Sequence, residues 1–267
     1  MIALRSLLRE LRQRDATLYW VGWLHLVLLL ALALIAPFDQ RIVTGINPWI
    51  KPMKFSFSNA AFLWTVGWFQ GYLLGPHRTK RLVSFGISLA MLAEIVLITM
   101  QAARGTTSHY NVATAFDAVV FAWMGLMIAL NTMLVALFLL LYFFARRAPL
   151  PAAFLWGIWL GLLLFLAGSL EGLVMIARGS HTVGAPDGGQ GLPWVNWSTQ
   201  AGDLRATHLL GLHSLQVIPL VGWLVSRLRN ISLPAQVVSV VAFAALYASL
   251  AVHLFLQALR GQPLLRL

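Results

Sequence analysis

The chain is a succession of long apolar runs separated by short polar segments. Runs of about 18 or more apolar residues are long enough to cross the hydrocarbon core of a bilayer as helices. The sequence therefore predicts an all-α integral membrane protein, a single bundle of about seven transmembrane helices. The predicted spans are Leu18–Ala36, Phe57–Leu74, Leu82–Ala102, Val112–Phe144, Ala152–Ile176, Leu204–Arg227 and Leu233–Leu259.

Residues 1–17 precede the transmembrane domain, which we place at residues 18–267. Leucines recur there at helical spacing with arginines between them, which predicts a basic amphipathic helix on the inner leaflet. These positions are Leu4, Leu7, Leu8 and Leu11, with Arg5, Arg9 and Arg12. The alternative is a cleaved signal peptide, because Ala31-Leu32-Ala33 resembles a cleavage site. Glu10 and Asp15 are unusual in such a leader and favour the amphipathic helix.

Basic residues at the ends of the spans set the predicted orientation. The chain is 60% hydrophobic and only 10% charged, with a net charge of +11. Its Lys and Arg residues are scattered over loop ends, which indicates membrane topology and not nucleic-acid binding. The denser basic runs lie on the side of the N-terminus, so we expect the N-terminus in the cytoplasm and the C-terminus outside. A multi-pass protein of a bacterial inner membrane, in contact with the lipid bilayer, is the expected setting.

Two further features limit the chemistry. The chain has no cysteine, which excludes disulfides, thiolate catalysis and metal centres held by Cys. The last predicted span, Leu233–Leu259, contains no lysine for a retinal Schiff base.

No polar stretch is long enough for a second domain, since the longest, residues 178–203, has the length of a loop.

Six ionisable residues interrupt the apolar spans at similar depth. If the spans alternate in direction, each lies about 4–9 residues, or roughly 6–14 Å, from the same side of the membrane. Charged groups in a bilayer are costly and usually face a cavity or a partner. The sequence therefore predicts an outward-facing polar pocket in the outer half of the bundle. Its six residues are Glu94, Asp117, Glu171, His208, His213 and His253.

Polar residues at the same ends of the spans extend this layer. Lys51 and Lys54 lie three apart, so a helix starting there carries both on one face, where they can bind an anion or reach lipid headgroups. The turn around Arg104 and His109 offers an anion clamp and a titrating group. Asp203 is expected to cap the sixth span with Arg205 close by, and both are candidate substrate-binding residues together with Lys51 and Lys54. Ser108 or Asn111 is expected to cap the fourth span.

Four classes of function fit these residues. The first is a membrane enzyme or redox protein with haem b or a divalent metal on His208, His213 and His253, because neutral imidazole is a common ligand for both. The second is a metal-free enzyme whose Glu94, Asp117 and Glu171 act as acid and base, with Arg104 and His109, on a lipid, isoprenoid or quinone. The third is a proton-coupled transporter, and the fourth an accessory subunit. A membrane-soluble or anionic small molecule is the expected ligand.

Small residues on the fifth span predict close helix packing. Gly157 and Gly161, then Gly168 and Gly172, form two pairs with three residues between their members. Such pairs let the backbone of a neighbouring helix approach closely. We therefore expect Glu171 to lie in a tightly packed environment.

Overall fold

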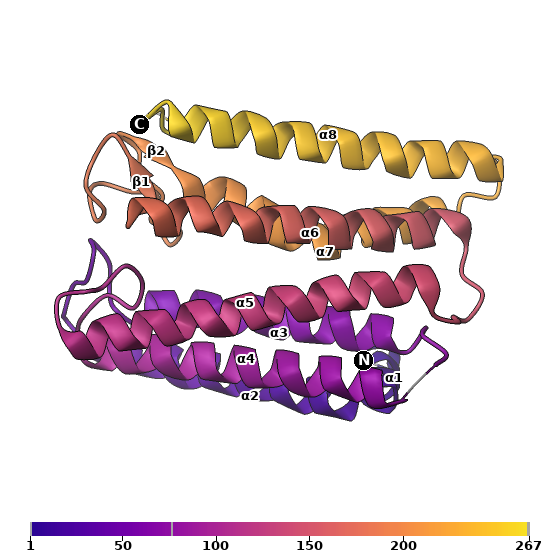
Figure 1. Ribbon diagram of the computed structural model, residues 1–267, viewed down its shortest axis with the longest axis horizontal. Helices are drawn as coiled ribbons and strands as arrows, with labels where there is room; N and C mark the ends of the chain where they lie inside the picture. Colours follow the sequence, from indigo (N-terminus) through magenta and orange to yellow (C-terminus); the bar gives the residue numbers. More distant parts are fainter. Residues whose placement is uncertain (1, 76, 266–267) are drawn as a thin grey trace. The chain divides into compact units, whose positions relative to one another are not determined.

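The computed structural model describes residues 2–75 and 77–265, which are almost entirely helical (Figure 1). Eight α-helices, one short 3-10 helix and two short strands follow one another along the described chain. They are α1 (Ile2–Arg14), α2 (Ala16–Ile35), η1 (Ala36–Phe38), α3 (Ile50–Gln70), α4 (His77–Ala103), α5 (Ala115–Phe144), α6 (Ala152–Arg178), β1 (Thr182–Val183), β2 (Gly202–Asp203), α7 (Leu204–Val225) and α8 (Leu233–Leu259).

Six of these helices are long and apolar enough to cross a membrane, so the fold is that of a multi-pass helical membrane protein. They are α2 with η1, α4, α5, α6, α7 and α8. The remaining predicted span, Phe57–Leu74, overlaps α3, which is 21 residues long. Four polar side chains lower the hydropathy of α3, and it is not one of the six helices named above. These side chains are Lys51, Lys54, Asn59 and Gln70.

The chain divides into two compact units, Met1–Ala148 and Pro149–Leu267. Unit 1 contains α1 to α5 and unit 2 contains α6 to α8 with the two strands. Nothing in the hydrophobic pattern marks this boundary, because the connection between α5 and α6, residues 145–151, is shorter than several of the other inter-helix segments. The six ionisable residues of the predicted layer are thus shared between units: Glu94 and Asp117 in unit 1, the others in unit 2.

Unit 1 is an antiparallel arrangement of long helices with α1 across one end (Figure 1). The guanidinium of Arg14 lies 4.3 Å from the ring centres of both Trp68 and Tyr72. It also donates to the carbonyl of Trp68 at 2.9 Å. Gly71 makes room for this side chain, since a Cβ there would lie 2.5 Å from Arg14 Cγ. The basic helix predicted at the N-terminus is therefore present and is held on α3.

Unit 2 is built on backbone contact between α6 and α7. A Cβ on Gly168 would lie 2.5 Å from the Cα of Gly211, and one on Gly161 would lie 3.0 Å from the carbonyl oxygen of Ser214. The hydroxyl of Ser214 donates to the carbonyl of Gly161 at 3.0 Å. The close packing predicted from the glycine pairs is confirmed, and α8 packs against the same two helices.

The loop between α6 and α7 has an ordered backbone. β1 and β2 pair antiparallel, with Thr182 opposite Asp203. Asp203 caps α7 as predicted, accepting from the backbone N–H of Arg205. Gly202 is required here, because a Cβ at this position would lie 1.9 Å from the carbonyl oxygen of Ala258 in α8.

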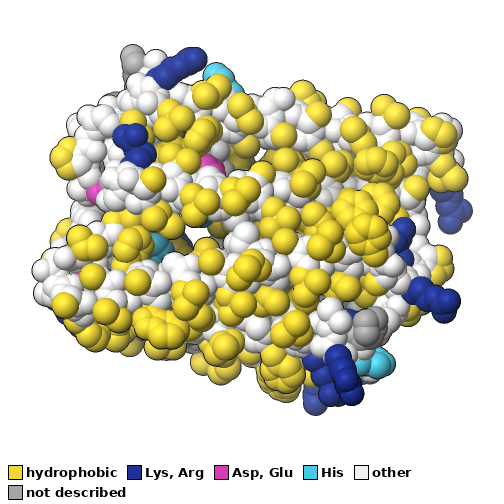
Figure 2. Space-filling view, in the orientation of Figure 1, with side chains coloured by type: hydrophobic (Ala, Val, Ile, Leu, Met, Phe, Trp, Pro, Cys, Tyr) yellow, Lys and Arg dark blue, Asp and Glu magenta, His cyan; other side chains and the backbone are white. Residues whose placement is uncertain are grey.

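Apolar side chains cover the flanks of the helices, and Lys and Arg gather toward their ends (Figure 2). The exposed apolar side chains include Leu34, Phe144 and Leu246, which are 74%, 85% and 71% exposed. Such surfaces are rare on soluble monomers and are suited to contact with lipid.

Replacement of Gly168 by Ala tests the α6–α7 contact. The added methyl group meets backbone that has no room to move aside, so we expect a loss of about 1–3 kcal/mol in stability. Thermal unfolding in detergent, followed by tryptophan fluorescence, measures it. Gly125→Ala in α5 is the matched control, since nothing lies within 4 Å of a Cβ there; we expect unchanged or slightly higher stability. Equal unfolding temperatures for Gly168→Ala and the wild-type protein would contradict the contact.

Candidate functional site

The strongest candidate site lies where the α2–α3 and α4–α5 loops meet the helices of unit 1, which we call the loop end. Glu94 lies on the buried face of α4 and is 1% exposed. Neither of its carboxyl oxygens has a hydrogen-bond partner among the described residues. His109 of the α4–α5 loop places Nε2 3.7 Å from Glu94 Oε1. The Nζ of Lys51 lies 3.2 Å from His109 Nδ1, so the three groups form a chain.

Aromatic rings surround His109 and fix its position. The ring centres of Phe55 and Phe121 lie 5.8 and 6.4 Å from the imidazole. Ser108 Oγ lies 3.0 Å from His109 Nδ1. The side chain of His109 remains 25% exposed, so it connects the buried carboxyl of Glu94 to the surface.

Asp117 has a different environment from Glu94. Its carboxylate accepts from Gln101 Nε2 at 2.8 Å and from Arg104 Nη1 at 2.5 Å. Thr114 Oγ1 donates to it at 2.6 Å and caps α5 by accepting from the Asp117 backbone N–H. Arg104 also bonds the side-chain oxygen of Gln101. The expected caps, Ser108 and Asn111, were wrong, because α5 begins later than the predicted span.

A second ion pair, besides that of Arg104 with Asp117, stabilises the loop end. Arg41 binds the carboxylate of Asp39 at 2.6 Å and donates to the carbonyl of Ala103 at 2.9 Å. Trp49 Nε1 donates to Asp39 Oδ2 at 2.8 Å. Hydrogen bonds from Arg41, then from Trp49, hold the pKa of Asp39 well below its ordinary value, and the same pair raises the pKa of Arg41. These contacts tie the α2–α3 loop to the end of α4.

His208 of unit 2 lies against α6 at the glycine contact, beside the two glycines that flank Glu171 in the sequence. His208 Nδ1 lies 2.9 Å from the carbonyl of Gly168, and its Cε1 would lie 3.4 Å from a Cβ on Gly172. In the neutral form the N–H therefore sits on Nδ1. Glu171 Oε1 is buried without a hydrogen-bond partner among the described residues.

The structure does not bring the histidines of unit 2 into a metal site. His253 is exposed on α8, and His213 is half-buried on a different face of α7 from His208. Within residues 2–75 and 77–265, no group of three or more His, Asp or Glu side chains is placed to hold a metal ion. The predicted haem or metal site is therefore unsupported.

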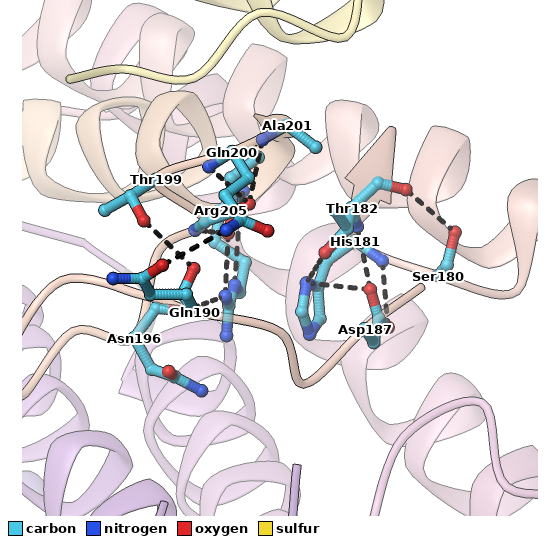
Figure 3. A network of polar contacts seen from close by, with 12 residues as sticks. Ser180, His181, Thr182, Asp187, Gln190, Asn196, Thr199, Gln200, Ala201 and Arg205 are labelled. Carbon is cyan, nitrogen blue, oxygen red and sulfur yellow. Dashed lines mark hydrogen bonds and ion pairs between the residues drawn. The ribbon is translucent and has the colours of Figure 1, made fainter. Parts of the chain in front are cut away.

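Asp203 and Arg205 take part in a network that holds the α6–α7 loop (Figure 3). Arg205 Nη2 binds Asp203 Oδ2 at 2.7 Å and also the carbonyl of Asn196. In the same view, His181 Nδ1 lies 3.1 Å from Asp187 Oδ1. Since both oxygens of Asp203 accept hydrogen bonds from the protein, this pair has a structural role that binding of a substrate would have to disrupt.

Sequence reasoning missed several partners of the site. Gln101, Thr114 and Asp39 carry the hydrogen bonds that distinguish Asp117 from Glu94 and fix the loop end. The signal was present for Thr114, which stands three residues before Asp117 as a capping side chain does. Nothing in the spacing pointed to Asp39, because its partner Trp49 lies across a loop.

Comparison with known proteins identified no matching family model, no similar curated protein and no similar solved structure. The function has to be argued from the geometry of the loop end.

The low pKa of Asp39 predicts a pH dependence that an Asp39→Asn variant reveals. Because the folded-state pKa lies below the ordinary value of 3.8, the carboxylate stabilises the folded protein at all pH values above that ordinary value. The contribution is lost as the pH falls further toward the folded-state pKa. We expect wild-type protein to unfold at higher temperature than Asp39→Asn by a constant margin from about pH 8 to about pH 5, and the margin to narrow below about pH 4. A margin that shrinks near neutral pH would contradict this assignment.

Proposed function

We propose that the loop end of unit 1 is a metal-free acid–base site that acts on a membrane-dissolved substrate with a polar or anionic head. The observation that carries the proposal is Glu94, a buried carboxyl whose oxygens find no hydrogen-bond donor among the described residues and one of which lies 3.7 Å from the imidazole of His109. An unpaired buried carboxylate is costly. Charge on Glu94 therefore has to be matched by a proton on His109 or Lys51, which couples the three groups.

The roles follow from the contacts. Glu94 gives or takes the proton, and the half-exposed His109 exchanges that proton with water. Lys51 supplies positive charge beside the imidazole. Two carboxyl groups in contrasting environments are the usual arrangement for acid–base work, and Asp117 is the one held ionised by Arg104. We assign the binding of an anionic head to Lys54 and to Arg104, whose side chain stays 40% exposed beside Asp117.

The topology completes the proposal. We place α3 in the membrane as a seventh span, because α2 and α4 pack along its length. With the N-terminus and the basic helix α1 in the cytoplasm, the loop end faces outward or to the outer leaflet. With the protein in a bacterial inner membrane, a substrate dissolved in that leaflet reaches the partly exposed His109, which carries protons to and from the buried Glu94.

The chemical state of Glu94 can be tested with dicyclohexylcarbodiimide, an apolar reagent that modifies protonated carboxyl groups in membranes. We expect modification of Glu94 at about neutral pH and none of Asp117, because the carboxylate of Asp117 is paired with Arg104. Mass spectrometry of the purified, detergent-solubilised protein locates the adduct. Glu94→Gln is the control and removes it. Modification of Asp117 with Glu94 untouched would overturn the assignment.

The enzymatic part is tested with the total lipid extract of the membranes that contain the protein. We expect the wild-type protein to convert a lipid species, and the conversion to fall by at least about a hundredfold in Glu94→Gln, as is usual on loss of a general acid or base. Mass spectrometry of the extract before and after incubation measures it. Gly125→Ala serves as the active control. Identical lipid profiles with wild-type protein and Glu94→Gln would rule out an enzyme acting on these lipids.

A further inference from the structure

Unit 1 contains a series of buried polar atoms that have no hydrogen-bond partner among the described residues. Buried polar groups are nearly always satisfied in folded proteins, so each exception requires an explanation. These atoms come from three neighbouring helices, α3, α4 and α5. They are Ser56 Oγ, Gln70 Oε1, Ser88 Oγ, both carboxyl oxygens of Glu94, Thr99 Oγ1 and Asn131 Oδ1.

Contacts between the helices give the relative depth of these residues. Gln70 Nε2 donates to Ser84 Oγ at 3.0 Å, which sets the antiparallel register of α3 and α4. By this register Ser56 lies level with Thr99, and Asn59 lies level with Glu94. On the other side of α4, a Cβ on Gly86 would lie 2.4 Å from the Leu134 side chain of α5.

The second register places Asn131 level with Ser88. Since Gln101 also contacts Asp117, α4 and α5 keep one register along their shared length. Both side chains are buried, 5% and 4% exposed. Two oxygens without a hydrogen-bond partner, Ser88 Oγ and Asn131 Oδ1, therefore lie at one level of unit 1.

The level of Glu94 contains a further titratable group. His25 of α2 is 1% exposed, and its Nε2 lies 3.3 Å from Asn59 Nδ2. Its Nδ1 lies 2.9 Å from the carbonyl of Val21. The imidazole of His25 and the carboxyl of Glu94 thus lie at one depth in the interior of unit 1.

The series ends in a hydrogen-bonded chain near α1. Gln70 bonds Ser84, and Ser84 Oγ donates to the carboxylate of Asp15. Asp15 caps α2 by accepting from the Leu18 N–H at 2.9 Å and is half-buried. At the other end, Glu94 is joined to the partly exposed His109.

We infer that the interior of unit 1 conducts protons between Asp15 at the α1 end and Glu94 with His109 at the loop end. This inference rests on the proposed function, in which Glu94 exchanges a proton with His109. Glu94 gives its proton to His109 Nε2, and the imidazolium releases it to the solution. The carboxylate of Glu94 is then reprotonated from Asp15 through water held near Ser84 and at the level of Ser88 and Asn131, so each group returns to its starting state.

The distances along α4 suit bridging by internal water. Ser84 and Ser88 are one turn apart, about 6 Å of rise, and Ser88 and Glu94 are about 9 Å apart. Internal waters typically make about three hydrogen bonds to buried polar groups that lack other partners. The route follows α4 and α5 because Ser88 and Asn131 carry the unsatisfied oxygens between the levels of Ser84 and Glu94.

Proton flux into liposomes tests the inference. The full-length protein is reconstituted with a potassium gradient, and valinomycin sets the membrane potential while an enclosed pH-sensitive dye reports proton entry. We expect flux well above that of empty liposomes for the wild-type protein. It should fall to the empty-liposome level in Glu94→Gln and in Asn131→Leu, which have nearly unchanged side-chain volumes.

Glu171→Gln is the matched control, because it neutralises a carboxyl of unit 2 that also has an unsatisfied oxygen. It should conduct as the wild-type protein does, and thermal unfolding in detergent establishes that each variant is folded. Wild-type flux equal to that of empty liposomes overturns the inference, as does full flux in a folded Glu94→Gln. Carbodiimide modification of Glu94 without flux refutes the path and leaves the acid–base site standing, whereas an unmodified Glu94 refutes the site itself.

Discussion

Lipid cannot satisfy a hydrogen-bonding group, so each polar side chain between the helices has to be matched from within its own unit. Several hydroxyl groups meet this constraint in the same way, by donating to a backbone carbonyl of a neighbouring helix. Tyr142 donates to Phe69 and Ser214 to Gly161 at 2.7 and 3.0 Å. Tyr247 of α8 donates to Leu210 of α7 at 2.7 Å. Each of these bonds fixes the register of one pair of helices.

The same constraint explains why the two carboxyl groups of unit 1 differ. Asp117 stands in the first turn of its helix, beside a capping threonine and within reach of a loop arginine, so donors surround it. Glu94 stands deeper on α4, where neighbouring helices offer few donors and only the inserted loop brings one near. Position along the helix, more than residue type, decides which carboxyl is surrounded by hydrogen-bond donors.

The sequence predicted the helical class and six of the spans, because hydropathy and the length of an apolar run determine both. It predicted the Gly168 contact as well, since only small residues permit backbone approach. It could not predict which residues share an interior, because the faces of α7 and α8 depend on packing. His253 illustrates this limit: its depth matches that of His208, yet it points away from the packed core of unit 2.

The backbone contact between Gly168 and Gly211 has a mechanical consequence for unit 2. At this point no side chain separates the two helices. α6 and α7 therefore cannot shift along each other without breaking van der Waals contacts along several turns, and they behave as one rigid body. Two side-chain hydrogen bonds to the backbone hold α8 on α7, from Thr207 to Ala251 and from Tyr247 to Leu210. We therefore expect a rearrangement inside unit 2 to move α8 relative to the pair of α6 and α7.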